Sequence, residues 1–318
     1  MLEKTAAEVR FDLNAKFRDP FTTAKGETRA SVRLLKLETL WINTGTICNL
    51  TCRNCYIESS PTNNRLVYIT NEEVCAYLEE IERGELRTRE IAFTGGEPFI
   101  NTEFVAIITS CLEAGFDVLV LTNAMRPMMK VADKLLELQS LYGEQLTLRV
   151  STDHYSTELH EEERGDNTWK PMLKGLKWLS DHGFNITVAG RTCWNEDEAS
   201  MRAGYKVLFA QENIRINADD PHSLVLFPEM SEGAEVPEIT TACWDILNVS
   251  PKSMMCSSQR MIVKRKGAER PTVVPCTLLP YDEQFDLGHE LLHSDKKLQL
   301  NHPHCAKFCV LGGGSCTG

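Results

Sequence analysis

Short apolar runs alternate with amphipathic stretches over most of this chain. The runs are rich in β-branched side chains and nearly continuous, as is typical of parallel strands buried on both faces. They cover residues 37–43, 90–94, 117–123, 146–152 and 185–191, with a sixth at 214–217 or 223–227. The stretches between them carry apolar residues at helical spacing, which predicts helices over residues 71–85, 101–116, 128–143, 172–184 and 196–211.

This alternation of strand and helix predicts the fold class. Parallel strands joined by right-handed helical crossovers form one sheet that closes or partly closes into a barrel. We therefore predict an α/β protein in which residues 37–229 form a partial (β/α)6 TIM-like barrel, preceded by an irregular N-terminal segment over residues 1–36. The pattern changes near Met230, and residues 230–318 are predicted to form a small C-terminal cysteine-rich α+β domain.

Composition and charge narrow the class of protein. The N-terminus carries charges where a signal peptide needs an apolar core, and no apolar run approaches the about 18 residues of a membrane span. We therefore expect a soluble, cytoplasmic protein whose 12 cysteines include metal ligands and buried thiols, without a disulfide framework. The net charge of −11 disfavours nucleic acid as a partner, and the one compact basic run, at residues 263–270, is predicted to be a solvated hairpin turn.

Three cysteines follow the first predicted strand, in the sequence CNLTCRNC. Cys48, Cys52 and Cys55 are separated by three and then two residues. Three thiolates on such a loop can hold three corners of a cubane iron–sulfur cluster, which leaves the fourth iron open. A zinc site with a distant fourth ligand is an alternative, although zinc sites usually pair cysteines two to four residues apart. Chance spacing is the other alternative.

The sequence TGGEP follows the second predicted strand, where the chemistry of such barrels gathers. CNLTCRNC and TGGEP at successive strand ends resemble the radical S-adenosylmethionine (SAM) superfamily. The resemblance implies that Cys48, Cys52 and Cys55 hold a [4Fe-4S] cluster whose open iron is chelated by the amino and carboxylate groups of SAM. It also implies that the second loop receives the methionine amino group, through residues Thr94, Gly95, Gly96 and Glu97.

Other strand ends supply further candidates for binding SAM. VSTD resembles the fourth-strand motif of the family, which implies contacts from Ser151 and Asp153 to the ribose or the methionine carboxylate, although both residues could instead cap a helix. Arg191 could pair with the SAM carboxylate or form a surface salt bridge. Asn123 is a further candidate, and Tyr56 follows the position where the family often has an aromatic residue, which is Asn54 here.

The cysteine-rich tail suggests a second metal site. Its cysteines resemble part of the auxiliary-cluster domains of the superfamily, called SPASM and, when shortened, twitch. The resemblance implies one further [4Fe-4S] cluster. Its predicted ligands are Cys256, Cys276, Cys305 and Cys309, with Cys316 as a substitute or fifth candidate. Zinc in the same ligands is the alternative, and His302 and His304 flank the loop that would serve it.

The predicted function follows from the resemblance. It implies an enzyme of the oxidoreductase or maturase type that cleaves SAM reductively to a 5'-deoxyadenosyl radical, and that abstracts hydrogen for a net oxidation or a cross-link. The expected substrate is a small molecule or a leaderless peptide, and the expected partner is a one-electron donor such as flavodoxin or ferredoxin. His154 and Tyr155 are candidates for an acid, a base or a radical relay, and Cys193 is a candidate hydrogen donor to a substrate radical. The alternative is an iron–sulfur or zinc protein that carries electrons or stabilises structure without turnover.

Overall fold

The computed structural model describes residues 16–228 and 235–314 of the chain. Its main feature is an eight-stranded sheet in the order β7-β6-β5-β4-β3-β2-β8-β9. Strands β2 to β7 are parallel neighbours in chain order, as predicted for a partial barrel. Their bounds are β2 Thr39–Asn43, β3 Glu90–Thr94, β4 Asp117–Thr122, β5 Leu146–Asp153, β6 Asn185–Arg191 and β7 Leu224–Phe227, so the sixth strand is the second of its two candidates.

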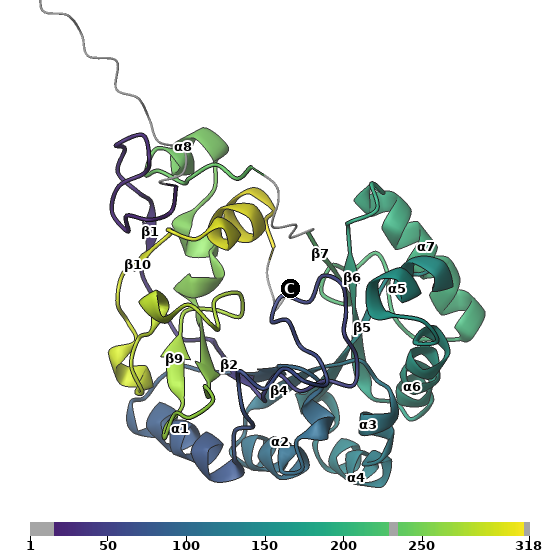
Figure 1. The fold of residues 1–318 in the computed structure, drawn as a ribbon. Coiled ribbons are helices and arrows are strands. Elements are labelled where there is room, and N and C mark those ends of the chain that lie inside the picture. The colour runs from purple at the N-terminus through teal and green to yellow at the C-terminus, as the bar shows by residue number, and fades with distance from the viewer. Residues whose placement is uncertain (1–15, 229–234, 315–318) are drawn as a thin grey trace, which may run out of the picture.

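Helices connect these strands and cover the outer face of the sheet (Figure 1). Their bounds are α1 Asn71–Arg83, α2 Phe104–Glu113, α3 Arg126–Met129, α4 Ala132–Tyr142, α5 Thr157–Arg164, α6 Trp169–Asp181 and α7 Glu198–Glu212. The helix predicted over residues 128–143 is thus only partly correct, because a short helix and a longer one share this region. Helix α5 has no predicted counterpart, because its sequence TELHEEER lacks apolar periodicity.

The parallel strands contribute to a core on each face of the sheet. On β2, Leu40 and Ile42 join the core beneath the outer helices. Trp41, between them in sequence, points to the other face and joins a second core that includes Phe308 from the C-terminal part. Successive strand residues point to opposite faces, so burial on both faces explains the continuous apolar runs of the sequence.

The C-terminal part extends the barrel sheet. Strand β8 (Gln259–Val263) pairs parallel with β2, and β9 (Thr272–Val274) returns antiparallel to β8. The basic run at residues 263–270 therefore joins the two strands of a hairpin, as predicted, but it is not fully solvated, because Lys264 and Arg265 form ion pairs with Glu73 and Asp286. Because β8 belongs to the main sheet, the sheet crosses the predicted domain boundary at residue 230, and the division into domains stays a prediction.

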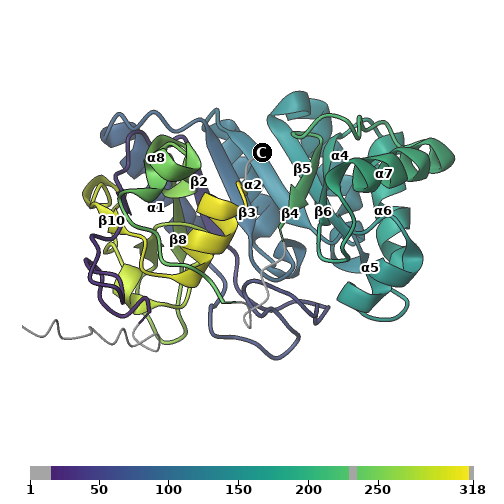
Figure 2. The ribbon, with the colours of Figure 1, turned by 90° about the horizontal axis from the view of Figure 1, so that it is seen from above.

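Smaller elements complete the C-terminal part. They are α8 (Cys243–Leu247), β10 (Leu298–Gln299), which pairs antiparallel with β1 (Ser31–Val32), and a π-helix at Cys305–Leu311. Figure 2 shows β8, β10 and α8 toward one end of the molecule and α5, α6 and α7 toward the other. None of the helices in the described part of the chain has the length and apolar character needed to cross a membrane.

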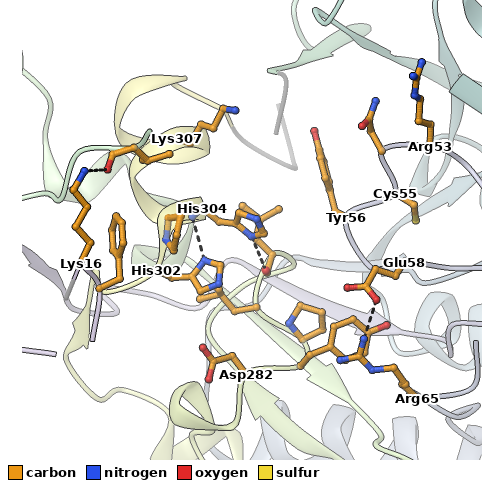
Figure 3. Close-up of a pocket in the computed structure, with 18 of the residues that line it drawn as sticks. Lys16, Arg53, Cys55, Tyr56, Glu58, Arg65, Asp282, His302, His304 and Lys307 are labelled. Carbon is orange, nitrogen blue, oxygen red and sulfur yellow. Dashed lines mark hydrogen bonds and ion pairs between the residues drawn. The ribbon is translucent and has the colours of Figure 1, made fainter. Parts of the chain in front are cut away.

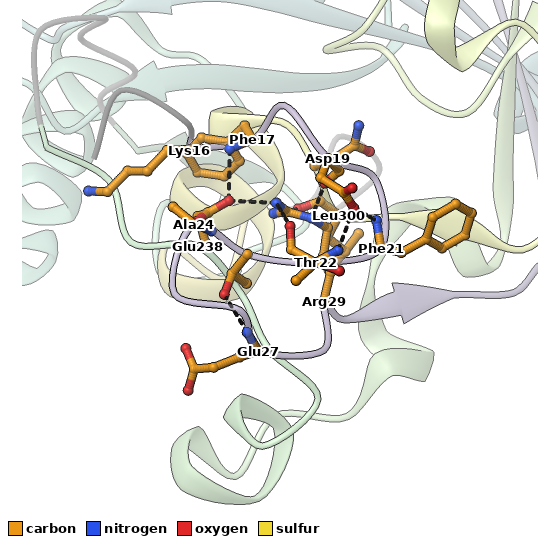
Figure 4. Close-up of polar contacts among 12 residues, drawn as sticks. Lys16, Phe17, Asp19, Phe21, Thr22, Ala24, Glu27, Arg29, Glu238 and Leu300 are labelled. Carbon is orange, nitrogen blue, oxygen red and sulfur yellow. Dashed lines mark hydrogen bonds and ion pairs between the residues drawn. The ribbon is translucent and has the colours of Figure 1, made fainter. Parts of the chain in front are cut away.

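Polar contacts fix the N-terminal segment to the stretch that follows the barrel (Figure 4). The guanidinium of Arg29 is buried, forms an ion pair with Glu238 and donates hydrogen bonds to the carbonyl oxygens of Asp19 and Thr22. Glu238 also accepts a hydrogen bond of 2.7 Å from the backbone N–H of Phe17. Side-chain hydrogen bonds thus satisfy part of the backbone in residues 16–30, which form no helix.

Candidate active site

The cysteine loop, residues 48–55, begins a few residues after the end of β2 and is held from outside by helix α5. The backbone N–H of Arg53 donates to the carbonyl oxygen of Glu163 at 2.8 Å. The Glu163 carboxylate accepts hydrogen bonds from the backbone and side-chain nitrogens of Asn54, at 2.9 and 2.8 Å. Cys48 is buried and Cys52 is half-buried. The last turn of α5 therefore sets the path of the second half of the loop.

The glycine loop after β3 lies against the segment that leads into the cysteine loop. The backbone N–H of Gly96 donates to the carbonyl oxygen of Gly45 at 2.8 Å, and that of Glu97 donates to the carbonyl oxygen of Ile47 at 3.1 Å. A Cβ atom on Gly96 would lie 2.0 Å from the Ile47 carbonyl oxygen. Glycine is therefore required at this position for contact with the neighbouring loop, whatever the loop binds.

Glu97 is buried within the protein and does not line the cavity formed by the cysteine loop and the strand ends. Its carboxylate accepts hydrogen bonds from the Thr122 hydroxyl at 2.9 Å and from the backbone N–H of Asn123 at 2.8 Å. Burial raises the pKa of Glu97 to about 7, although these hydrogen bonds oppose the rise. Glu97 therefore fixes the end of β4, including Asn123, next to the cysteine loop.

One cavity of about 150 Å³ collects the three cysteines and most of the predicted SAM-binding residues. Of the nine residues predicted to bind SAM, all but Glu97 lie on its walls. These wall residues are Tyr56, Thr94, Gly95, Gly96, Asn123, Ser151, Asp153 and Arg191. They come from the carboxyl ends of the parallel strands, which explains why residues far apart in sequence converge.

Asp153 and two arginines form a buried ionic network on one wall of this cavity. Asp153 lies at a β-bulge at the end of β5, with a φ of 56°. Its carboxylate is 2.7 Å from Nε of Arg164 and 3.3 Å from Nε of Arg191. Burial raises the pKa of Asp153, but Arg164 and then Arg191 outweigh burial, so the pKa lies below its ordinary value. The Asp153 carboxylate is therefore ionised and already neutralised by the protein.

The alternative roles of these residues do not match the structure. Helix α5 takes Ser156 as its N-cap, so Ser151 and Asp153 do not cap it. Arg191 is not in a surface salt bridge, because its ion pair with Asp153 is buried. The Arg191 guanidinium also lies 4.6 Å from the centre of the Tyr56 ring, in a cation–π contact. Tyr56 and Arg191 are thus positioned together on the cavity wall.

Two residues that sequence analysis missed belong to this site. Arg164 lies on the cavity wall, and Glu163 holds the cysteine loop. Burial raises the pKa of the Cys52 thiol to about 11, and the Arg164 guanidinium opposes this rise, so Arg164 favours the thiolate that a metal needs. Both residues sit in a strongly charged helix whose sequence is typical of an exposed one, and no local signal marks them as buried.

The acid, base and relay candidates lie elsewhere. His154 is buried, with Nδ1 at 3.0 Å from the Ser156 hydroxyl and Nε2 at 3.5 Å from the Glu196 carboxylate. The Tyr155 hydroxyl donates to the same carboxylate at 3.1 Å. Neither these residues nor Cys193 line the cavity that holds the three cysteines. The structure therefore does not bring them to the candidate site.

Residues 42–201 match the family model described as the radical SAM superfamily, and this span contains both loops and the carboxyl ends of β2 to β6. The chain belongs to the radical SAM superfamily. Members of this superfamily use a [4Fe-4S] cluster with SAM, so the match confirms the predicted family, enzyme class and first cofactors. One cavity is lined by three thiols, which could bind the iron of the cluster, and by the glycine loop, which could receive SAM.

Two sequence relatives each match somewhat less than half of the chain. The antilisterial bacteriocin subtilosin biosynthesis protein AlbA of Bacillus subtilis (strain 168) is 32% identical over 143 residues, which are 45% of this chain and 30% of AlbA. GTP 3',8-cyclase of Haemophilus influenzae (strain PittEE) is 26% identical over 142 residues, 43% of this chain and 40% of the cyclase. Each match thus spans less than half of the relative.

The fold is similar to that of Streptococcus suis SuiB bound to S-adenosylmethionine. The TM-score is 0.59 at 13% sequence identity, and the match covers 81% of this chain and 65% of SuiB. This similarity confirms the predicted partial-barrel fold class. Because it extends over most of the chain, it includes part of the region beyond the radical SAM match.

Four cysteines of the tail surround a second, apolar cavity. Its walls come from the segments just before β8 and just after β9, from β10 and from the π-helix, and its cysteines are Cys256, Cys276, Cys305 and Cys309. His304 lines the same cavity but His302 does not, and Cys316 lies outside the described residues. The open space is about 20 Å³, enough for roughly one water molecule, so a cubane would displace the surrounding side chains. The four thiols therefore identify this as a candidate metal site, although the cavity between them is too small for a cluster as it stands.

A buried cation accompanies these thiols. Arg260 is fully buried and donates hydrogen bonds to the carbonyl oxygens of Cys256 and Ser294, and among the described residues it has no carboxylate in an ion pair. Burial lowers the pKa of Arg260 to about 10, and the charges of Cys256, Cys276 and Asp295 oppose this fall. A buried guanidinium needs negative charge nearby, and thiolates bound to a metal would add to the charge of Asp295.

A third cavity, of about 1200 Å³, shares wall residues with both sites (Figure 3). Cys55 and Tyr56 line both this large cavity and the cavity of the cysteine loop. Leu278 and His304 line both the large cavity and the cavity of the tail cysteines. The large cavity thus lies between the two candidate metal sites and is in contact with both.

Proposed function

We propose that this chain is a radical SAM enzyme that modifies a peptide. The observation that carries the proposal is the shared wall of two cavities. Cys55 and Tyr56 separate the cavity that collects the predicted SAM-binding residues from a much larger one. A substrate in the large cavity would therefore lie next to the position where the radical is generated.

The cofactors supply the difficult chemistry. When bound, a reduced cluster would supply the one-electron cleavage of SAM and, through it, the removal of a hydrogen atom from a substrate C–H bond. The thiolates of Cys48, Cys52 and Cys55 would hold the cluster and leave a position for SAM, and polar side chains surround the cavity. Of these, Asn123 and Ser151 can orient the cosubstrate, while Arg191 stays fixed by Asp153 and Tyr56.

The size of the large cavity favours a peptide over a small metabolite. Sites for small molecules usually have volumes of about 300 to 1,000 Å³, and this cavity exceeds them at about 1200 Å³. Its walls carry cations and carboxylates together with apolar residues, which suits a stretch of polypeptide. SuiB, which shares the fold, has been solved with the precursor peptide SuiA, and AlbA is a bacteriocin biosynthesis protein. These relatives support a peptide substrate.

We further propose that the tail cysteines hold an auxiliary [4Fe-4S] cluster. Four thiols around one cavity and a buried guanidinium beside two of them support this assignment. The cluster would take the electron left on the substrate after hydrogen abstraction, or bind the substrate directly. Either role permits a net oxidation or a cross-link. A one-electron donor such as flavodoxin or ferredoxin would reduce the cluster of the cysteine loop.

Cleavage of SAM without substrate tests the proposed function. Protein reconstituted with iron and sulfide without oxygen, and reduced with dithionite, should convert SAM to 5'-deoxyadenosine. Cys52→Ala should abolish the conversion, whereas Cys75→Ala, on the outer helix α1, should retain it. An electron carrier without turnover would produce no 5'-deoxyadenosine in any of the three proteins, and this result would overturn the proposal.

The substrate class has its own test. Peptides encoded by neighbouring genes can be prepared with deuterium at their carbon-bound positions and incubated with the enzyme and SAM. Deuterium in the 5'-deoxyadenosine identifies the peptide as the source of the abstracted hydrogen. Transfer from GTP or another labelled metabolite, with none from the peptides, would show that the substrate is a small molecule.

A further inference from the structure

A basic cleft lies outside the barrel at the end of β4. It has a volume of about 700 Å³, and its walls include Arg126 of α3, Lys130 after that helix and Lys134 of α4. All three side chains are exposed, and within the described residues none forms an ion pair with a carboxylate. No Asp or Glu of the described chain lines the cleft, and Asp133 and Glu137 on α4 lie outside it. Such a cluster of cations stands out on a chain with a net charge of −11.

The floor of this cleft is apolar. Phe99 and Phe104 are buried residues that contribute to its walls, together with Val131. An apolar centre with charged side chains at its rim is the usual arrangement of a protein–protein contact surface. The cleft therefore has the composition of a docking surface and not only of a solvated helix face.

The cysteine loop itself contributes to the wall of the cleft. Asn49, the neighbour of Cys48 in the chain, lines the cleft. Its side-chain oxygen accepts a hydrogen bond of 3.0 Å from the amide of Asn123, and that amide nitrogen is 4.0 Å from the sulfur of Cys48. Asn123 and Cys48 both line the cavity of the cysteine loop. A protein bound in the cleft would thus lie close to a cluster held by this loop.

We propose that Arg126, Lys130 and Lys134 form the docking surface for an acidic one-electron carrier protein. This inference rests on the proposed function, which requires one electron for each SAM cleaved. In this electron transfer, the carrier is oxidised by one electron and the cluster of the cysteine loop is reduced by one electron. The cations attract a carrier with negative charges around its redox cofactor, while the negative charge of the remaining surface disfavours other orientations.

The test compares two kinds of reductant in charge-reversal variants. The docking variant is Arg126→Glu/Lys130→Glu/Lys134→Glu. The control variant is Lys25→Glu/Lys252→Glu/Lys297→Glu, which makes the same change of charge at exposed residues outside the cleft. Each protein, reconstituted with iron and sulfide, is assayed for 5'-deoxyadenosine with dithionite, with reduced flavodoxin and with a reduced acidic ferredoxin, over a range of carrier concentrations and of salt.

The docking variant should retain the rate of the parent with dithionite, because this small reductant needs no docking surface. With the carriers, its kcat/KM at low salt should fall by at least about tenfold, since electrostatic steering accelerates association by roughly 10- to 1000-fold. The loss should shrink as salt screens the charges. The control variant should behave as the parent, and Arg126→Gln/Lys130→Gln/Lys134→Gln should give an intermediate loss.

Different outcomes separate this inference from the proposed function. Absence of 5'-deoxyadenosine from the parent with dithionite would refute the proposed function itself. A parent that works with dithionite but shows no saturable dependence on either carrier would overturn the docking surface alone. Equal carrier dependence in the parent and the docking variant, or an equal loss in the docking and control variants, would also overturn it.

Discussion

Replacement of Arg164 by methionine should destabilise the protein markedly. Arg164 and Asp153 form an ion pair of 2.7 Å whose side chains are 10% and 4% exposed. Removal of one partner from a buried pair typically lowers the free energy of unfolding by about 3 to 5 kcal/mol, because the other charge stays buried. Arg191, at 3.3 Å from the same carboxylate, still offsets part of this charge, so we expect a loss near the lower limit, about 3 kcal/mol.

The assay is urea denaturation of the metal-free protein, followed by tryptophan fluorescence, with Lys206→Met as a control. Lys206 pairs with Asp219 at the surface, with side chains 66% and 61% exposed, so its replacement should change the free energy of unfolding by less than about 1 kcal/mol. Asp153→Asn combined with Arg164→Met should lose less than the sum of the single variants. A loss for Arg164→Met no larger than that of the control would refute the buried network.

Three other predictions concern the glycine loop, the loop cysteines and Glu97. Gly96→Ala places a Cβ atom 2.0 Å from the Ile47 carbonyl oxygen, so iron bound at the cysteine loop and SAM cleavage should fall together; full iron content would contradict this explanation. The triple alanine variant of the three loop cysteines should retain about four of the roughly eight irons of two cubanes, measured by Mössbauer spectroscopy, whereas one bound zinc without iron would indicate a structural tail. Burial raises the pKa of Glu97 from 4.5 to about 7, so its protonation stabilises the folded state fully below pH 4.5 and this contribution is lost as the pH rises to about 7. Glu97→Gln should flatten the pH dependence of the free energy of unfolding in this window, and an unchanged slope would count against the assigned cause.

The sequence predicted the parts of the fold that depend on local pattern. Strands β2 to β4 were predicted closely because apolar cores cover both of their faces, and β5 and β6 because each has a buried apolar face. Strand β8 could not be placed beside β2, because its position depends on a parallel contact between segments more than two hundred residues apart. The burial of the last turn of α5 against the cysteine loop could not be predicted either, because the charged sequence of this helix is typical of an exposed one.

In the candidate site, too, the sequence predicted the features that depend on local pattern and missed those that depend on contacts between distant residues. Motifs close in sequence identified the cysteine loop and the glycine loop, and the barrel topology then placed Ser151 and Arg191 on the same cavity. Arg164 and Arg260 were missed, because a buried arginine and an exposed one look alike in a sequence. Their roles emerge only from partners that the fold brings together, a carboxylate for Arg164 and two thiols for Arg260.

Magnetic resonance of the reduced protein with labelled SAM tests the central claim most directly, namely that the cysteine loop holds a cluster with one iron open to SAM. The carboxylate of SAM would carry a magnetic oxygen isotope, and electron–nuclear double resonance would detect its coupling to the cluster. We predict such a coupling in the parent and its loss in the triple alanine variant of the loop cysteines. A reduced parent with excess labelled SAM and no coupling would contradict the account.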